Sequence, residues 1–366
     1  MRPIEIPLVL LGLIFVVAPM DAAIRTFVLP RGVPVAFTRV IFRMVRKVFN
    51  LMTQRARDYE SRDRIMALYA PISLLLLPTV FLLSIFAGFT CFYYVWDDVS
   101  WSNAFIESGS SLFTLGFARP PHLGMTFLSF AEAAIGLGLV ALLIAYLPTI
   151  YNTFSRREVA VTGLAVRAGT PPTAWEMLER AHRTGFLERL DETWETWETW
   201  FHELGETHTS LGVVSFFRSP NPHRSWITAS GAVLDAASMR LALIDLPWTP
   251  QAALCIRAGY LALREIADFF NIEYDPDPAP DGPISIARDE FDQVYARLAQ
   301  AGVKVKTDRD QAWRDYRGWR VNYDRVLTAL AGLVMAPYAP WSSDRSTYQP
   351  PRLRARNRDG RRVGRR

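Results

Sequence analysis

The sequence predicts an all-α membrane protein with three transmembrane helices, one re-entrant loop and a cytoplasmic α-helical domain. Long, mostly apolar runs cover residues 7–20, 65–96 and 125–151. A helix needs roughly 20 apolar residues to cross a hydrocarbon core about 30 Å thick. Between the second and third runs lies an apolar segment that is too short to span. From residue 156 onward the sequence is charged, amphipathic and aromatic, as in a soluble helical domain.

Hydropathy and charge divide the chain into five predicted parts. They are an N-terminal transmembrane helix at 1–30, a basic amphipathic cytoplasmic segment at 31–63, a membrane unit at 64–155, a cytoplasmic helical domain at 156–340 and a disordered basic tail at 341–366. The membrane unit itself is expected to contain an outer helix at 64–96, a short helix and loop at 102–118, and an inner helix at 125–152.

The first apolar run is expected to stay in the membrane. Asp21 and Arg25 are four residues apart, a spacing that permits an ion pair on one helical face. The alternative is a cleaved signal peptide, which would place the next segment outside the cytoplasm. That segment is rich in arginine, so the positive-inside rule favours a cytoplasmic position. The predicted topology in the cell (plasma or inner) membrane therefore has the N-terminus outside and the C-terminal domain inside.

Residues 35–57 are expected to form a basic amphipathic helix. Such a helix suits the cytoplasmic membrane surface, and a partly buried linker helix is the other interpretation. Eight arginines lie between Arg352 and Arg366 in the tail. Anionic lipid is the partner expected at the basic segment and the tail, because basic residues beside a membrane are attracted to its surface charge. No nucleic-acid partner is expected.

The segment between the second and third spans is the candidate functional region. Ser102 and Asn103 are suited to cap a short helix over 104–113, and the run Thr114–Ala118 follows it. A short helix that enters the membrane and returns as extended backbone is a re-entrant loop. Such backbone is tolerated at membrane depth only where it is buried in protein or lines a water-filled path.

Residues 110–117, Ser-Ser-Leu-Phe-Thr-Leu-Gly-Phe, resemble the end of the pore helix and the selectivity filter of the potassium-channel pore family. The resemblance covers about residues 65–155, and the tetrapeptide by itself is a weak signal. It implies a filter formed by Thr114, Leu115, Gly116, Phe117 and Ala118. Backbone carbonyls from four copies would replace the hydration shell of an ion there.

Two residues depart from the family pattern. Ala118 occupies the position of the second filter glycine, where a side chain costs roughly 1–2 kcal/mol per subunit if φ is positive. Arg119 occupies a position where an acidic residue is usual. Four arginines at this outer mouth would oppose cation entry unless Asp97, Asp98 or Glu107 pairs with them. These departures bear on ion selectivity.

The inner helix contains three residues of interest. Gly136 and Gly138 resemble the glycine hinge of an inner pore helix, and close packing of small residues is the other interpretation. Glu132 is an ionisable group within an apolar span, so we expect it to face protein or water. A structural hydrogen bond, a brace behind the filter and a proton sensor are its candidate roles.

Helices are also expected throughout the cytoplasmic domain, at 171–183, 186–205, 225–246, 249–270, 284–301 and 308–335. Trp194 and Trp197 are expected to pack in a helix seam. His202 and His208 lack the spacing of a zinc-protease helix. The loop 218–224 contains two arginines and a histidine, and either binds an anion or forms a capped turn.

The predicted function is a cation-channel subunit that conducts K⁺ or another monovalent cation through a homotetramer. One loop supplies a quarter of a filter, so four copies are needed. No enzyme activity is expected, and no cofactor apart from the permeant ion. Two alternatives stay open. One is a non-conducting receptor of the pore fold, and the other is a membrane-anchored helical adaptor or enzyme that acts through residues 156–340.

Overall fold

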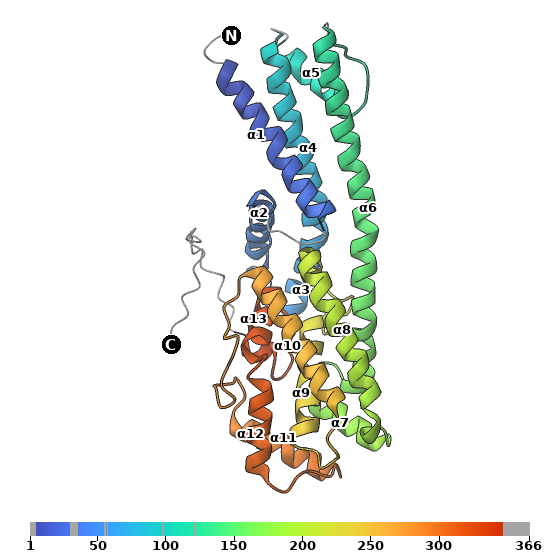
Figure 1. Cartoon of the computed structure of the whole chain (residues 1–366), viewed down its shortest axis with the longest axis vertical. Coiled ribbons are helices and arrows are strands. Elements are labelled where there is room, and N and C mark those ends of the chain that lie inside the picture. Colours follow the sequence, from blue (N-terminus) through green and yellow to red (C-terminus); the bar gives the residue numbers. More distant parts are fainter. Residues whose placement is uncertain are drawn as a thin grey trace.

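The computed structural model describes residues 5–29, 36–54, 56, 58–96, 99–120 and 122–346. Within these ranges the protein is helical, and its β structure is limited to an antiparallel bridge between Ile244 and Val305. The molecule is elongated, with α1, α4, α5 and the first half of α6 at one end and α7–α13 at the other (Figure 1). The predicted all-α class is confirmed.

The first six helices form the apolar end and its junction with the bundle (Figure 1). Their bounds are α1 Glu5–Ala23, α2 Ala36–Thr53, α3 Tyr59–Ala67, α4 Tyr69–Trp96, α5 Trp101–Leu112 and α6 Leu123–Ala168. A π-helical turn, Ile24–Val28, extends α1. Among the described residues, three segments are long and apolar enough to cross a membrane, and they are Glu5–Val28, Tyr59–Trp96 and Leu123–Ala168. They include the three predicted spans, as expected of a membrane protein.

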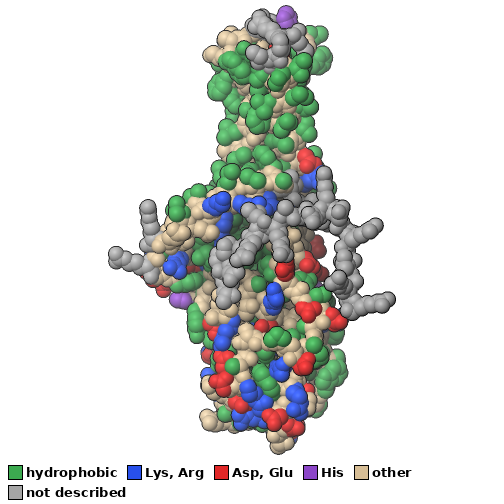
Figure 2. All heavy atoms as spheres, turned by 90° about the vertical axis from the view of Figure 1, so that its left-hand side faces the viewer, with side chains coloured by type: hydrophobic (Ala, Val, Ile, Leu, Met, Phe, Trp, Pro, Cys, Tyr) green, Lys and Arg blue, Asp and Glu red, His purple; other side chains and the backbone are tan. Residues whose placement is uncertain are grey.

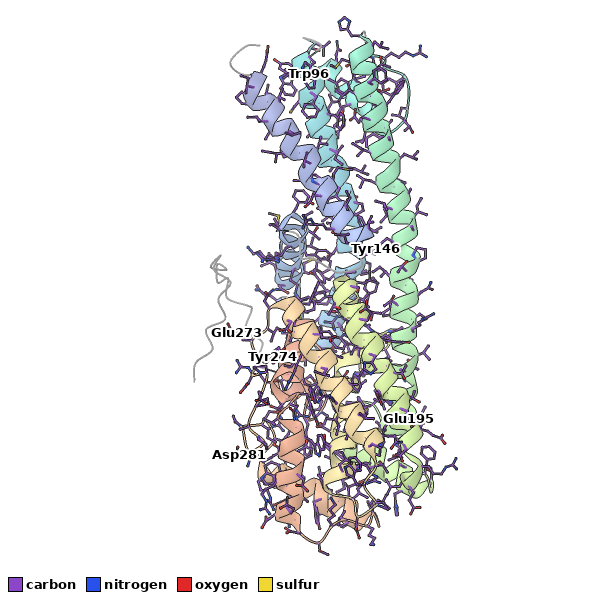
Figure 3. All side chains as sticks on the ribbon, in the orientation of Figure 1. Trp96, Tyr146, Glu195, Glu273, Tyr274 and Asp281 are labelled. Carbon is purple, nitrogen blue, oxygen red and sulfur yellow. The ribbon has the colours of Figure 1, made fainter. Side chains whose placement is uncertain are left out.

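The other end is a bundle of shorter helices. Their bounds are α7 Ala174–Arg183, α8 Asp191–Ser210, α9 Trp226–Ala242, α10 Pro250–Phe270, α11 Arg288–Gln300, α12 Arg309–Arg320 and α13 Asp324–Val334. Hydrophobic side chains dominate the surface of the apolar end, whereas charged side chains of both signs cover much of the bundle (Figure 2). Trp96 lies at the far end of the apolar half and Tyr146 near its junction with the bundle (Figure 3).

Several helix boundaries differ from the prediction, three of them by a division of the helix or a long extension. The expected single helix from residue 64 is divided at Leu68, and Pro71 lies in the first turn of α4, where its missing N–H is not needed. The inner helix does not end at 152. It continues to Ala168 and stops at Gly169, whose φ is 82°. The expected helix 308–335 is divided at residues 321–323 into α12 and α13.

Close backbone contact joins α1 to α4. A Cβ on Gly12 would lie 2.9 Å from the carbonyl oxygen of Gly88, and a Cβ on Gly88 would lie 2.8 Å from the carbonyl oxygen of Gly12. Glycine at both positions therefore allows the helices to cross at this distance, a packing typical of membrane helices. Beyond the crossing, the predicted ion pair is confirmed, since Arg25 Nε donates to Asp21 Oδ1 at 2.7 Å.

The basic helix α2 is partly buried, as expected of a linker helix. Ile41, Val45 and Phe49 are buried against the rest of the protein. On the adjacent side, Met44 and Val48 are exposed. The helix is therefore partly buried and also presents an apolar strip.

Aromatic packing and buried ion pairs of Arg320 hold the bundle together. Trp194 and Trp197 are buried in its core, as expected of a helix seam. Arg320 is fully buried and donates two hydrogen bonds to Asp235, at 2.6 and 2.7 Å. It also donates to the carbonyl of Trp341 at 2.6 Å. Residues 341–346 therefore pack on the bundle, beyond the point where a tail was expected to begin.

Arginines connect the two ends of the molecule at the C-terminus of α13. Arg46 of α2 donates to the carbonyl of Leu333 at 2.9 Å, and Arg218 donates to the carbonyl of Val334 at 2.8 Å. Cations are favoured at this end of a helix because its last carbonyls have no partners within the helix. Arg218 also forms a largely buried ion pair with Asp63 of α3. The bundle is thus attached directly to α2 and α3.

Candidate functional site

The predicted short helix between the second and third spans is present as α5. It begins one turn earlier than the expected cap, because the Oγ of Ser100 accepts a hydrogen bond from the backbone N–H of Asn103 at 3.3 Å. Ser102 and Asn103 therefore lie within the helix. Twelve residues of α5 correspond to a length of about 18 Å.

Contacts with α4 and α6 show that α5 descends along both helices from their far end. Trp101 at the start of α5 stacks on Tyr94, with ring centroids 4.2 Å apart. Near the end of α5, Ser108 contacts Phe86, which lies ten residues before Trp96 and thus about 15 Å along α4. On α6, the end of α5 contacts Gly136, about 20 Å from the first residue of that helix. The chain then returns to Leu123.

The C-terminus of α5 is closed by a Schellman motif. The N–H of Thr114 donates to the carbonyl of Ser111 at 3.0 Å, and the N–H of Leu115 donates to the carbonyl of Ser110 at 2.8 Å. Thr114 therefore occupies the left-handed position, with φ of 53°, where glycine is usual. A β-branched residue is rare in this region and costs roughly 1–2 kcal/mol.

Ser110 also holds the returning chain. Its Oγ accepts a hydrogen bond from the N–H of Ala118 at 3.0 Å. In the loop, φ is positive at Thr114 and Gly116, where it is 72°, but not at Ala118. Alanine is therefore accommodated at 118 without the strain considered for that position. The side chains of Leu115 and Phe117 are 62% and 68% exposed, so this chain by itself leaves the loop uncovered.

Glu132 joins three helices behind the loop. It lies on α6 and is fully buried. The hydroxyl of Ser108 on α5 donates to Oε1 at 2.6 Å, and the hydroxyl of Tyr93 on α4 donates to Oε2 at 3.1 Å. The expectation that Glu132 faces protein is confirmed. A carboxyl group with two buried donors fixes α5 relative to its neighbours, because breaking either bond leaves a polar group without a partner.

The two glycines of α6 have different surroundings. A Cβ on Gly136 would lie 2.3 Å from the carbonyl oxygen of Leu112, the last residue of α5. A Cβ on Gly138 would have no neighbour within 4 Å in this chain. The helix is continuous through both residues. Gly136 thus permits close packing of α5 on α6.

The residues expected at the outer mouth of a pore have different surroundings in the structure. Arg119 is exposed next to Ala118. Glu107 lies on α5 and is buried. Asp97 and Asp98 lie outside the described residues.

A second polar cluster links α6 to the bundle, just beyond the apolar part of α6. Arg157 is buried, pairs with Glu158 at 2.8 Å, and donates to the carbonyls of Val214 and Phe217, both at 2.8 Å. Its Nη1 lies 3.2 Å from Nε2 of the buried His208. Burial, together with the Arg157 charge, holds the pKa of His208 well below its usual range.

The described residues contain no group of three or more His, Cys, Asp or Glu side chains arranged to hold a metal ion. His202 and His208 differ in burial, because the first is exposed and the second lies in the core. Comparison with protein-family models, with curated proteins and with solved structures gave no match.

Several residues of the site were not identified from the sequence. Ser108, Ser110 and Ser111 all bond to other elements, and Ser111 contacts Ser129 of α6 at 2.6 Å between their hydroxyl oxygens. The sequence feature that could have identified them is the presence of three serines within four positions of a short apolar helix. Each hydroxyl in an apolar environment requires a hydrogen-bond partner, so three together indicate contacts with other segments. Nothing in the sequence around Tyr93 identified it as a hydrogen-bond partner of Glu132.

Proposed function

We propose that this chain is one subunit of a tetrameric cation channel with a pore of the potassium-channel type. The observation that supports it best is the path of α5 and of the loop after it, residues 101–120. A helix begins near the far end of α4, contacts α6 about 20 Å from the first residue of α6, and ends in a loop with positive φ at two residues. Such a path suits a pore loop, whose backbone is tolerated at membrane depth when it lines water.

The exposed loop supports assembly of four copies. Leu115 and Phe117 are apolar and more than half exposed, on a loop whose other side is fixed to Ser110. Three further chains around a common axis would cover these side chains and bring four sets of carbonyl groups together. A ring of backbone carbonyls replaces the hydration shell of a cation. The filter in this proposal is Thr114–Ala118, with monovalent cations as the permeant ions.

The strain at Thr114 also supports a role in conduction. Glycine at this position would form the same helix cap without the cost of a left-handed threonine. A strained residue next to a candidate ion path is a hypothesis of function. The hydroxyl of Thr114 would supply an additional oxygen ligand at the inner end of the filter.

The proposed topology places α1, α4 and α6 across the cell membrane, with the N-terminus outside. The basic residues of α2 and the bundle then lie on the cytoplasmic side, in agreement with the positive-inside rule. The bundle would regulate or stabilise the pore through Arg218 and Arg157, which bind it to α3 and α6.

Ion flux from liposomes tests the proposal. The full-length protein is reconstituted, and flux is compared for potassium, sodium and no cation gradient, with Gly116→Asp as the blocked variant. Cation flux that is lost in Gly116→Asp is the expected result. Equal flux of potassium and sodium would still support a pore, and we would then attribute the lack of selectivity to Ala118 and Arg119.

Arg119 favours a second candidate, a non-conducting receptor of the same fold. Its exposed charge lies at the proposed outer mouth, where it opposes cation entry. A verified tetramer without flux would favour this candidate if the double variant Ala118→Gly, Arg119→Asp then conducts. A tetramer that stays silent with both changes, and a protein that is not a tetramer, would each refute the channel.

A further inference from the structure

Helix α2 presents a strip of exposed apolar side chains at the junction between the apolar end and the bundle (Figure 1). Met44 and Leu51 are both 63% exposed, Val48 is 57% exposed and Val40 is 45% exposed. Their spacings of four, four and three residues place them on one face of the helix. A continuous apolar face of this kind, here called the α2 strip, is typical of an interaction surface.

The α2 strip points away from the bundle. Arg46 marks the bundle side of the helix, because it donates to the carbonyl of Leu333 at 2.9 Å and its guanidinium lies 5.6 Å from the ring centroid of Phe216. Met44 and Val48 are each two residues from Arg46, and two residues correspond to about 200° around a helix. The strip therefore lies on the opposite side of α2 from the bundle.

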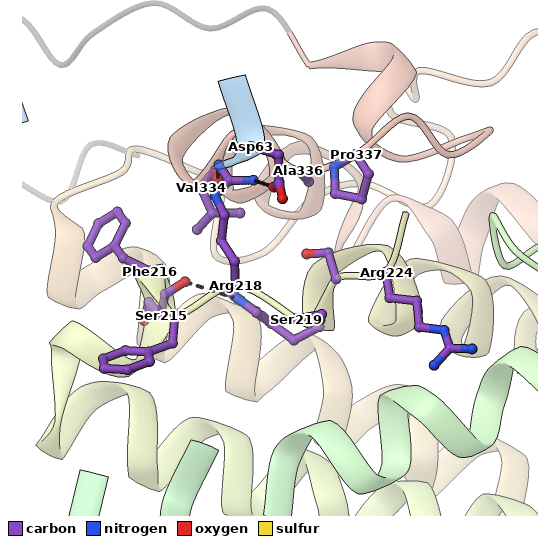
Figure 4. Close-up of a pocket in the computed structure, with 12 residues that line it drawn as sticks. Asp63, Ser215, Phe216, Arg218, Ser219, Arg224, Val334, Ala336 and Pro337 are labelled. Atoms are coloured by element: carbon purple, nitrogen blue, oxygen red, sulfur yellow. Dashed lines mark hydrogen bonds and ion pairs between the residues drawn. The ribbon is translucent and has the colours of Figure 1, made fainter. Parts of the chain in front are cut away.

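The bundle also holds the helix that follows α2. Asp63 of α3 pairs with Arg218, which donates to the carbonyl of Val334 at the end of α13 (Figure 4). Together with the Arg46 contact, this attachment restricts the orientation of α2. The strip is therefore a fixed feature of the surface, and whatever covers it lies on the side away from the bundle.

Charge and position indicate a membrane surface as the occupant. Arg43 and Lys47 are exposed along one edge of the strip, three and seven residues after Val40. Basic side chains also lie where the hydrophobic surface of the apolar end meets the bundle (Figure 2). A helix with an apolar face and basic residues beside it is suited to lie in the plane of a membrane interface. A second copy of α2 would instead bring like charges together, which disfavours pairing of two strips.

We propose that α2 lies on the membrane leaflet that faces the bundle and binds anionic lipid. The α2 strip enters the acyl region beneath the headgroups, while Arg43 and Lys47 contact the lipid phosphates. Because Arg46 joins α2 to α13, this contact also positions the bundle against the membrane. The inference rests on the proposed insertion of α1, α4 and α6 in the membrane, but not on ion conduction.

Fluorescence quenching by spin-labelled lipids tests the position of α2. The variant Met44→Cys, in a background with Cys91→Ala and Cys255→Ala, is labelled with an environment-sensitive dye, and the full-length protein is reconstituted in liposomes. We expect a nitroxide near the headgroup to quench this dye more than a nitroxide at the end of the acyl chain. The reason is that an interfacial helix is buried only about 5–10 Å into the boundary between headgroups and acyl chains.

Two other exposed positions serve as matched controls in the same background. Leu83 lies midway along α4 and is 57% exposed, so the dye at Leu83→Cys should be quenched most by the deep nitroxide. Val166 is 76% exposed near the end of α6, so the dye at Val166→Cys should not be quenched by either lipid. The three positions thus distinguish the membrane interior, the interface and water.

The anionic partner is tested with the same dye at Met44→Cys. Nitroxide-labelled phosphatidylglycerol is compared with nitroxide-labelled phosphatidylcholine at equal content in the liposomes. We expect stronger quenching by the anionic lipid. The relative affinity for this lipid should fall about fivefold in each of Arg43→Gln and Lys47→Gln, since one basic group near an anionic surface contributes about 1 kcal/mol. Arg189→Gln, which changes an exposed arginine of the bundle, should keep the preference.

Each of three results would overturn the proposal. An unquenched dye at Met44→Cys, with a quenched dye at Leu83→Cys, would place α2 in water while the spans remain in the membrane. Equal quenching by the two headgroups would remove the anionic partner. A disulfide between copies after oxidation of unlabelled Met44→Cys would identify a second copy as the occupant. Loss of quenching at Leu83→Cys as well would refute insertion of the spans, so failure of the proposed membrane topology is distinguished from failure of the α2 contact.

Discussion

Substitution of Gly136 by alanine tests the packing of α5 on α6. The new Cβ would lie 2.3 Å from the carbonyl oxygen of Leu112, so α5 has to move by about 1 Å to reach van der Waals distance. Gly138→Ala is the matched control, two residues away on the same helix with open space around it. Both changes gain the same helix propensity, about 1 kcal/mol, so this term cancels in the comparison.

The remaining difference between the two variants is the cost of overpacking, about 1–3 kcal/mol. Gly136→Ala should therefore unfold at a lower temperature than Gly138→Ala, by roughly 2–4 °C per kcal/mol. Unfolding in detergent is followed by intrinsic fluorescence, and flux in liposomes is measured in parallel. The displaced end of α5 also displaces Thr114, so flux should fall in Gly136→Ala.

Equal unfolding temperatures for the two variants would refute the close approach of α5 to α6. A lower unfolding temperature of Gly136→Ala with normal flux would support the close packing of α5 on α6 but would show that this packing is not needed for conduction. Both outcomes can be distinguished whichever monovalent cation the proposed channel conducts.

Three further predictions concern the site and its connection to the bundle. Thr114→Gly should raise the free energy of unfolding by roughly 1–2 kcal/mol, because the left-handed position no longer contains a β-branched residue. It should also reduce flux or selectivity, and unchanged conduction would contradict a role for the hydroxyl. Glu132→Ala should lower the free energy of unfolding by about 2–4 kcal/mol, since two buried hydroxyls lose their acceptor. Glu132→Gln, which keeps an acceptor, should recover much of this loss in the same denaturation assay. His208 has a lowered pKa in the folded protein, caused by burial and Arg157, so the unfolded state binds more protons below about pH 6.5. Its contribution is complete above that pH, and the free energy of unfolding should fall by up to about 1.4 kcal/mol per pH unit as the solution is acidified. Denaturation from pH 7 to 5 should give a shallower slope in His208→Gln, and an unchanged slope would contradict a neutral buried histidine.

The sequence was sufficient for features that depend on neighbours along the chain. The three apolar helices follow from hydropathy, since a span requires a continuous run of apolar residues. The Asp21–Arg25 pair follows from a four-residue spacing on one helix. Helix ends were predicted less well. Leu68, where α3 and α4 divide, and Ala168, where α6 ends, depend on packing and capping as much as on residue type.

The order of segments along the chain also indicated the candidate site, but not the residues that hold it in place. The order of apolar run, short helix, Thr114–Ala118 and glycine-containing helix is visible in one dimension. That Glu132 faces protein was foreseeable, because a carboxyl group in an apolar span needs partners. Which partners it has, Ser108 and Tyr93, was not, because they come from two other helices that lie 24 and 39 residues away in the chain.

Tertiary structure alone decided the contacts between distant segments. Arg218 and Asp63 are 155 residues apart, and no pattern in either segment specifies the other. Arg46 and Leu333, whose carbonyl accepts its hydrogen bond, are likewise 287 residues apart. Residue type and spacing determine which helices form and which faces are apolar, because those effects act within a few turns. Pairings across the fold, and the cavities between them, depend on how the helices pack together, which follows from the whole set of side chains at once.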